Sequence, residues 1–330
     1  MSMASSCVVP HLKILRRVGF IGLQPPRPNA PGASPRARRL HNFYCWFTLV
    51  GTSFHVLQHL ICAYQGRHDV AGLSRTLYEM FSFCTCVSKQ VAIRVHQRRV
   101  DLLLAALDDP LYNQPGERFA RMMRETAKGA KMIMRTFYSC GVCTVTLWLT
   151  FPVVHRLKGN YVEFPFWTFV DYTEPKMFAL VALHSAYMTA LLSMGNTTTD
   201  VFIGSLLYQC TTQLRILRIN FESLTERARK LSEELNESYE TTLRKLLVEC
   251  IQHFQKIADM TEEILAVFGE AILVLFGVGA WMMCTAAYTL ISVSNLAYCS
   301  CLRNALMIDD FARSRHHAKL FSTAREGKYF

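Results

Sequence analysis

The amino-acid sequence predicts an all-α fold, a polytopic membrane helical bundle with a cytoplasmic N-terminus and an intracellular helical extension. Hydrophobic residues make up 51% of the 330 residues, although the net charge is +11. Several apolar runs reach about 20 residues, the length of helix that crosses a bilayer. Lys and Arg are concentrated in alternate connecting segments, as in multi-spanning membrane proteins. The competing class, a large soluble protein with buried helices, fits runs of this length poorly.

Residues 1–40 are predicted to form a basic cytoplasmic arm. They contain seven Lys or Arg and no Asp or Glu, and they show no cleavable signal peptide. Five prolines interrupt the arm: Pro25, Pro26, Pro28, Pro31 and Pro35. We therefore expect a flexible segment, or a short amphipathic helix over residues 11–21 that lies on the inner membrane face.

The transmembrane bundle is predicted over residues 41–293. Its spans are expected at about residues 43–64, 70–93, 135–155, 176–200 and 264–293. The second span is the weakest because it contains Arg75, Glu79 and Lys89, of which Arg75 and Glu79 are spaced to pair on one helix face. The fifth is the strongest and contains a single charged residue, Glu270.

The distribution of basic residues orients these spans. Residues 1–40, 94–133 and 211–262 contain seven, eight and eight Lys or Arg, whereas the intervening connections contain four in all. Because Lys and Arg favour the cytoplasmic side, the N-terminus is predicted to be cytoplasmic. The basic charge therefore indicates topology and contact with membrane lipids. Nucleic acid is not an expected partner, since no aromatic-basic motif accompanies the charge.

Two cytoplasmic helical regions are predicted, at residues 97–133 and 201–262. In the first, one helix ends at Pro110, and a second begins near Glu117 and runs into the third span. The second region continues the fourth span without a break. Its apolar residues recur every three or four positions: Ile203, Leu206, Leu207, Cys210, Leu214, Leu217 and Phe221. Outside the bilayer such a stripe needs a protein partner, so we expect assembly through these helices.

Enzymatic chemistry is not indicated. The sequence contains no Gly-rich phosphate loop, nucleophile elbow, HExxH motif or paired catalytic carboxylates, so we expect neither an enzyme nor a cofactor. Cys140 and Cys143, with His55 and His59, could make a zinc site on paper. The two pairs are separated by roughly 10 Å along the membrane normal at 1.5 Å per residue, so packing roles are favoured.

The connection at residues 156–176 is rich in aromatic residues. Two interpretations remain open. Trp and Tyr are typical of a belt at the membrane interface, and a loop stiffened by Pro165 and Pro175 could also fold back as a lid over a cavity.

Three stretches resemble the insect odorant receptors, seven-span chemoreceptors with a cytoplasmic N-terminus. They are FPFWTFVDYTEP before the fourth span, TTTDVFIGSLLYQCTTQLRILRINFESL with Asp200, Gln213 and Leu214, and the segment from Glu249, Cys250 and His253 through the fifth span. The similarity extends over roughly residues 40–293. Gustatory receptors share the architecture and are the alternative family.

The resemblance implies an odorant receptor subunit, the odour-binding part of a ligand-gated non-selective cation channel in olfactory sensory transduction. Such channels are tetramers of an odour-binding subunit with a co-receptor subunit, located in the plasma membrane. The helices beneath the membrane form an anchor layer between subunits. The odour pocket lies in the outer half of the bundle, between the second, third, fourth and sixth spans.

Small volatile odorants favour a pocket of aromatic and aliphatic side chains. Helix position within the implied pocket selects seven candidate ligand-binding residues: Tyr78, Phe81, Thr144, Trp148, His184, Tyr187 and Met188. The competing role for each of them is ordinary helix packing.

The sequence departs from the family pattern after Val293. The family continues with a sixth and a seventh span, whereas residues 294–330 form a divergent basic tail that is too polar to cross a membrane. The simplest explanation is a truncated or alternatively spliced product, or a gene model that reads past the true splice site, and each of these makes conduction by this chain alone doubtful. A non-conducting interaction subunit that pairs through its cytoplasmic helices is a further alternative.

Overall fold

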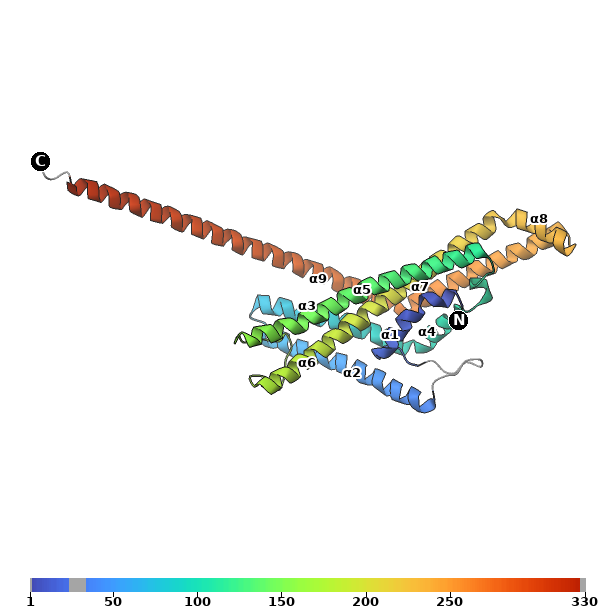
Figure 1. Ribbon diagram of the computed structural model, residues 1–330, viewed down its shortest axis with the longest axis horizontal. Helices are drawn as coiled ribbons and strands as arrows, with labels where there is room; N and C mark the ends of the chain where they lie inside the picture. Colours follow the sequence, from blue (N-terminus) through green and yellow to red (C-terminus); the bar gives the residue numbers. More distant parts are fainter. Residues whose placement is uncertain (1, 24–33, 327–330) are drawn as a thin grey trace. The chain divides into compact units, whose positions relative to one another are not determined.

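The computed structural model describes residues 2–23 and 34–326, and these residues form helices and their connections with no β-strand. The chain divides into two compact units, Met1–Val278 and Gly279–Phe330. The helices, shown in Figure 1, are α1 Val9–Arg17, α2 Pro35–Gln65, α3 Val70–Val95, α4 Gln97–Ala106, α5 Glu117–Leu157, α6 Pro175–Leu191, α7 Thr197–Glu222, α8 Leu224–Leu235 and α9 Tyr239–Glu326. Short 3₁₀ turns occupy Ala4–Cys7 and Pro110–Tyr112, and a π turn occupies Leu192–Asn196.

The N-terminal segment contains a short amphipathic helix, α1, close to the one expected over residues 11–21, but this helix packs into the protein and residues 2–23 do not form a flexible arm. Leu15 and Phe20 are almost fully buried and belong to the same hydrophobic core as Phe202 of α7. The apolar face of α1 is thus buried against protein. This burial removes apolar surface from water and makes the packed segment more stable than a free arm. Pro25, Pro26, Pro28 and Pro31 lie outside the described residues, and Pro35 begins α2.

One large hydrophobic core joins α1, α4, α7 and the beginnings of α5 and α9. We call it the basal cluster, and its members include Cys7, Leu12, Leu15, Phe20, Val100, Leu104, Leu107, Tyr112, Met123, Phe202, Leu206, Cys250, Ile257, Ile264 and Phe268. The rings of Phe202 on α7 and Phe268 on α9 meet edge to face at 6.2 Å between centroids. The predicted amphipathic stripe of residues 201–222 is therefore partly buried within this chain.

Helix ends in the first half follow local sequence signals. The Ser34 hydroxyl accepts a hydrogen bond from the Ala37 N–H, and Pro35 occupies the first turn of α2. α4 ends at Ala106 ahead of Pro110, as predicted, and Asp109 accepts a hydrogen bond from the Leu111 N–H. α5 runs from Glu117 to Leu157 without a break. The polar stretch after Glu117 therefore continues directly into the third predicted span.

The fourth predicted span contains an irregularity that the apolar pattern does not indicate. Between α6 and α7 the backbone forms a π turn at Leu192–Asn196. Within this turn Gly195 packs against the ring of Phe20, so close that an added Cβ would lie 2.2 Å from the Phe20 Cζ atom. The N-terminal segment is thus fitted against the turn that links α6 to α7.

The region 201–262 is helical but divided. α7 ends at Glu222, and Asn236, with φ 55°, ends α8 in the left-handed conformation. α9 begins at Tyr239 and ends at Glu326, so residues 294–326 of the expected tail are helical. The part of α9 up to Val278 belongs to the first unit.

Three helices of the described chain are long and apolar enough to cross a membrane: α5, Pro175–Glu222 and Tyr239–Ala287. They contain the third and fourth predicted spans and residues 264–287 of the fifth. The first and second predicted spans coincide with α2 and α3, which are more polar. On α2, Phe43, Trp46 and Phe47 point outward and are more than half exposed, as side chains that face lipid would be. The five-span arrangement stays a prediction.

Candidate functional site

A cavity of about 600 Å³ lies between α3, α5 and the connection at residues 158–174. Its lining residues are Arg75, Thr144, Leu147, Trp148, Phe151, Pro152, His155, Tyr161, Val162, Glu163, Phe164 and Pro165. Most of these side chains are apolar or aromatic. A volume of this size falls within the range of about 300–1,000 Å³ that is typical of small-molecule sites.

One face of α5 supplies half of this lining. Its members, Thr144, Leu147, Trp148, Phe151, Pro152 and His155, recur three or four residues apart. Residues with that spacing lie above one another on a helix. The helical period of α5 therefore builds one continuous, mainly apolar wall.

The connection between α5 and α6 forms the opposite wall. Phe164 and Phe166 are buried with Phe178 of α6, whereas Tyr161 and Phe169 are exposed. The backbone N–H of Trp167 donates to the Gln58 carbonyl of α2 at 3.1 Å, and the Gln58 side-chain amide donates to the Trp167 carbonyl, also at 3.1 Å. The loop thus folds back onto the helices in its middle and exposes aromatic side chains elsewhere. The two expected interpretations, a belt at the membrane interface and a lid over a cavity, both stay predictions.

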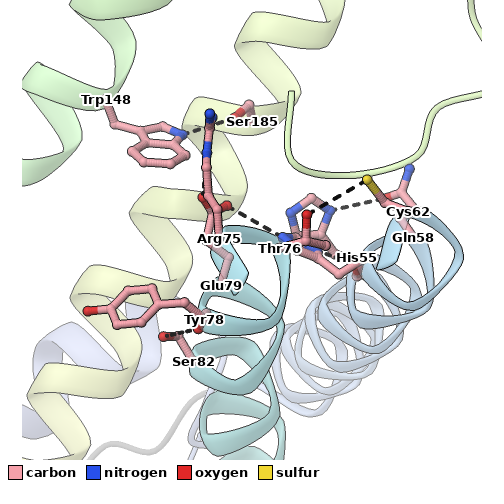
Figure 2. A network of polar contacts seen from close by, with 11 residues as sticks. His55, Gln58, Cys62, Arg75, Thr76, Tyr78, Glu79, Ser82, Trp148 and Ser185 are labelled. Atoms are coloured by element: carbon pink, nitrogen blue, oxygen red, sulfur yellow. Dashed lines mark hydrogen bonds and ion pairs between the residues drawn. The ribbon is translucent and has the colours of Figure 1, made fainter. Parts of the chain in front are cut away.

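A polar group of α2 and α3 residues lies beside the cavity (Figure 2). His55 Nδ1 is 2.9 Å from Gln58 Oε1, and His59 Nε2 is 3.5 Å from Glu79 Oε2. Arg75 Nε is 4.0 Å from Glu79 Oε1, the same-face pair that the sequence predicts. Glu79 therefore joins Arg75, at the cavity, to the buried His59.

The structure brings together two of the seven predicted site residues at this cavity. Thr144 and Trp148 line it, and the Trp148 indole N–H donates to the Ser185 hydroxyl at 3.2 Å. His184 lies nearby, with its ring 5.3 Å from that of His55 and 5.9 Å from that of Phe166. The Nε2 atom of His184 is buried and has no hydrogen-bond partner among the described residues.

The other predicted residues lie elsewhere. Met188 packs with Phe83 and Leu191 in a separate buried cluster. Tyr78 and Tyr187 are 49% and 42% exposed, and Figure 2 shows Tyr78 extending from α3 away from His55. Phe81 is not part of the lining. The assignment of these residues to a ligand site stays a prediction.

Several lining residues were not among those predicted. Leu147, Phe151 and His155 could have been found by continuing the helical period from Thr144 and Trp148. Arg75 was recognised only as a charged residue of the second span. The loop residues from Tyr161 to Pro165 have no periodic signal, because their position depends on the loop's contacts with α2 and α6.

A second polar group joins α3 to α7. The buried Lys89 ammonium is 2.6 Å from Asp200 Oδ1 and donates to Asn196 Oδ1 at 2.7 Å. The pairing satisfies a charge that would otherwise be costly to bury. No group of three or more His, Cys, Asp or Glu side chains in the described part of the chain is arranged to hold a metal ion.

A chain of hydrogen bonds that runs in one direction joins polar residues next to the basal cluster. Arg227 donates to Asn220 Oδ1 at 2.9 Å, and the Asn220 amide donates to Gln114 Oε1 at 2.8 Å. The Gln114 amide lies 3.4 Å from His253 Nδ1, and His253 Nε2 lies 3.0 Å from Gln213 Oε1. The Gln213 amide then donates to the Tyr112 carbonyl at 2.9 Å.

The two ends of this series of hydrogen bonds determine the protonation state and tautomer of His253. Arg can only donate and a backbone carbonyl can only accept, so every intermediate group must accept on one side and donate on the other. His253 therefore accepts at Nδ1 and donates from Nε2, as a neutral imidazole. Burial also lowers the pKa of His253 below its ordinary value, opposed by Asp109 and assisted by Lys256.

Comparisons with known proteins identify the family. The family model described as 7tm Odorant receptor matches residues 69–302. A search of curated proteins found no match.

Among solved structures, the insect olfactory receptor OR5 from Machilis hrabei is 14% identical and superposes with a TM-score of 0.65, covering 84% of this chain and 69% of that one. The same receptor in complex with eugenol is 15% identical, with a TM-score of 0.69 and coverage of 86% and 70%. At these identities the likeness shows a shared fold. The family comprises membrane receptors and not enzymes. Because its model matches well over half of the sequence, this chain belongs to the 7tm odorant receptor family.

Proposed function

We propose that this chain is the odour-binding subunit of a ligand-gated, non-selective cation channel that it forms with a co-receptor subunit. The observation that carries the proposal is the cavity between α3, α5 and the connection at residues 158–174. Its size and its aromatic and aliphatic walls suit a small volatile compound. The solved receptor with the same fold is described in complex with eugenol, which supports a small organic odorant as the ligand here.

Plasma-membrane residence with a cytoplasmic N-terminus belongs to this proposal. The packing of α1 against α7 supports the orientation, because α7 follows the fourth predicted span at the end opposite to the connection 158–174. The N-terminal basic residues and the basic residues of α7 and α8 then lie on one side of the membrane. That is the distribution expected for cytoplasmic segments.

Assembly with a co-receptor is supported by apolar side chains that this chain leaves uncovered. Leu214 and Phe221 on α7, with Ile251 and Phe254 on α9, are each between 44% and 54% exposed. They lie on helices beyond the predicted spans, where lipid would not cover them. We propose that other subunits of a tetramer cover these side chains.

Co-expression with a co-receptor tests the function. Odour-evoked cation current is expected from the pair, and Trp148→Ala should raise the half-maximal odour concentration about tenfold, which corresponds to about 1.4 kcal/mol of binding free energy. Trp46→Ala is the matched control, since Trp46 lies on the outward face of α2 and is not among the lining residues.

Each outcome of this experiment is decisive when surface labelling shows equal amounts of protein at the membrane. A current that is lost or shifted by Trp148→Ala and unchanged by Trp46→Ala supports the proposal. A correctly displayed pair that gives no odour-evoked current would instead identify a non-conducting interaction subunit. Equal effects of both substitutions would show that the cavity takes no specific part in the odour response.

A further inference from the structure

Some polar groups that line the cavity between α3, α5 and the connection at residues 158–174 already have hydrogen-bond partners within the described part of the protein, and others do not. The Trp148 indole N–H donates to Ser185, and the Thr144 hydroxyl donates to the Cys140 carbonyl at 3.0 Å. The Tyr161 hydroxyl shares a hydrogen bond with the Tyr172 hydroxyl at 3.2 Å. Within the described chain, these three groups therefore already use hydrogen bonds that they could otherwise offer to a ligand.

Arg75 is the permanent donor that remains. Its guanidinium carries five N–H groups and cannot accept. Its Nε atom lies 4.0 Å from Glu79, a separation that allows ionic attraction and is too long for a hydrogen bond. Figure 2 shows the Arg75 side chain extending from α3 toward Trp148, which lines the same cavity. The guanidinium thus offers N–H groups at a largely apolar cavity.

His155 supplies a second polar group at the cavity that lacks a hydrogen-bond partner within the described chain. Its ring lies in the cavity lining, 5.5 Å from the ring of Phe151, and its Nδ1 atom is buried without a hydrogen-bond partner among the described residues. A buried polar atom without a partner is unfavourable. A ligand that carries one polar group could therefore gain affinity here that a hydrocarbon of the same shape could not.

The charges around Arg75 determine which polar ligand fits. Glu79 is its ion-pair partner, and Glu163 lines both this cavity and the small adjoining one that also contains Arg75. One guanidinium thus pairs with one carboxylate and shares the lining of both cavities with a second. A carboxylate ligand would add a third negative charge near these two carboxylates, whereas a carbonyl oxygen accepts hydrogen bonds without adding charge.

We propose that Arg75 is a specificity-determining residue that selects neutral carbonyl compounds, such as ketones, aldehydes and esters, over hydrocarbons and carboxylates of equal length. The proposal rests on the proposed odour-binding role of the same cavity. Leu147, Phe151 and Phe164 hold the alkyl part of the ligand, and the Arg75 guanidinium donates to its carbonyl oxygen.

The test is a binding titration of the purified full chain with octane, 2-octanone and octanoate, followed by tryptophan emission, since Trp148 lines the cavity. The wild-type chain should bind 2-octanone about tenfold more tightly than octane, the difference expected for one hydrogen bond to a charged donor. It should bind octanoate more weakly than 2-octanone. Arg75→Met should abolish the preference for the ketone and leave octane binding unchanged.

Two further variants complete the design. Arg67→Met makes the same substitution at an arginine that packs over the Tyr64 ring and donates to the Tyr64 carbonyl, outside the lining, so it should keep the wild-type preference. Glu163→Gln removes one of the two carboxylates and should strengthen octanoate binding several-fold. This variant keeps the proposal testable if Arg75→Met does not fold, as judged by circular dichroism and gel filtration.

The outcomes separate this proposal from the one on which it rests. If octane and 2-octanone bind equally to the wild-type chain, or if Arg75→Met keeps the preference, the role of Arg75 is wrong and the cavity remains a ligand site. If none of the three compounds binds to any variant, the odour-binding role of the cavity is itself wrong.

Discussion

His253 shows how a single buried side chain can make this protein sensitive to acid. The chain of hydrogen bonds from Arg227 to the Tyr112 carbonyl is satisfied only by the neutral imidazole. Protonation would turn His253 Nδ1 into a donor that faces the Gln114 amide, another donor. It would also bury a positive charge, a cost that the nearby Asp109 only partly offsets.

Stability should therefore fall when the pH falls below 6.5. The folded protein holds the pKa of His253 below the ordinary value of 6.5, so unfolding takes up a proton between the lowered folded pKa and 6.5. The stabilisation is fully present above pH 6.5 and decreases as the pH falls through that window. The thermal midpoint of the detergent-solubilised chain, measured from pH 8 to pH 5, should decline less steeply for His253→Gln than for the wild type.

The control for this series is His68→Gln, which changes an exposed histidine in the connection between α2 and α3. Its decline should match that of the wild type, because His68 is exposed and takes no part in the hydrogen bonds around His253. If the curves of thermal midpoint against pH are parallel for the wild type and His253→Gln, the chain of hydrogen bonds does not keep His253 neutral.

The candidate site was predictable from the sequence only where a helical period defines it. Thr144 and Trp148 follow from the face of α5, and the same period reaches Phe151 and His155. His184 and Met188 have equally suitable positions on α6, yet one packs against His55 and Phe166 and the other against Phe83. A period shows which residues share a face, but it does not show which neighbour that face meets.

At the level of helices, the apolar runs predicted the positions of the long helices well, but they did not predict where those helices are interrupted. α5 and the break before Pro110 follow directly from composition and from proline. The π turn at Leu192–Asn196 and the left-handed Asn236 do not. Both depend on contacts distant in sequence or on a single backbone conformation, neither of which changes the spacing of apolar residues.

Gly195 tests the fit between the N-terminal segment and the π turn. Gly195→Ala would place a methyl group 2.2 Å from Phe20 Cζ, closer than two carbon atoms can approach. Phe20 must then leave its buried position, and we expect a destabilisation of about 1–3 kcal/mol, typical of overpacking. Thermal unfolding would measure the loss, and limited proteolysis would show earlier cleavage within residues 1–23.

Gly204→Ala is the matched control, because Gly204 lies on α7 with nothing within 4 Å of an added Cβ. This substitution should stabilise the helix by about 0.5–1 kcal/mol through the higher helix propensity of Ala. If Gly195→Ala behaves like Gly204→Ala, the docking of Phe20 against the π turn is not part of the stable structure.

For the whole molecule, the fold class followed from run length and charge, whereas the docking of the N-terminus did not. An all-α bundle is the expected result of several apolar runs of about 20 residues. The burial of Leu15 and Phe20 depends on a complementary surface of α7 that no local pattern describes. This docking nevertheless constrains topology, because it places the N-terminus at the same end of the first unit as the residues of α7 that it contacts.

The orientation can be checked with sites that the sequence already contains. Asn236, in the sequence Asn236-Glu237-Ser238, matches the acceptor motif for N-glycosylation and lies exposed in the turn between α8 and α9. If the N-terminus and α8 are cytoplasmic, this exposed site never meets the glycosylation enzymes. The chain expressed in insect cells should therefore show no change in mobility after glycosidase treatment.

Epitope tags test the same orientation through a signal that is expected to be present. A tag inserted after Gly159, in an exposed part of the connection between α5 and α6, should bind antibody on intact cells, whereas a tag at Met1 should bind only after permeabilisation. The inverted topology predicts the opposite for both tags, together with a glycan at Asn236. Because α1 is packed against α7, the Met1 tag and Asn236 must report the same side of the membrane. A split result would contradict that packing as well as the orientation.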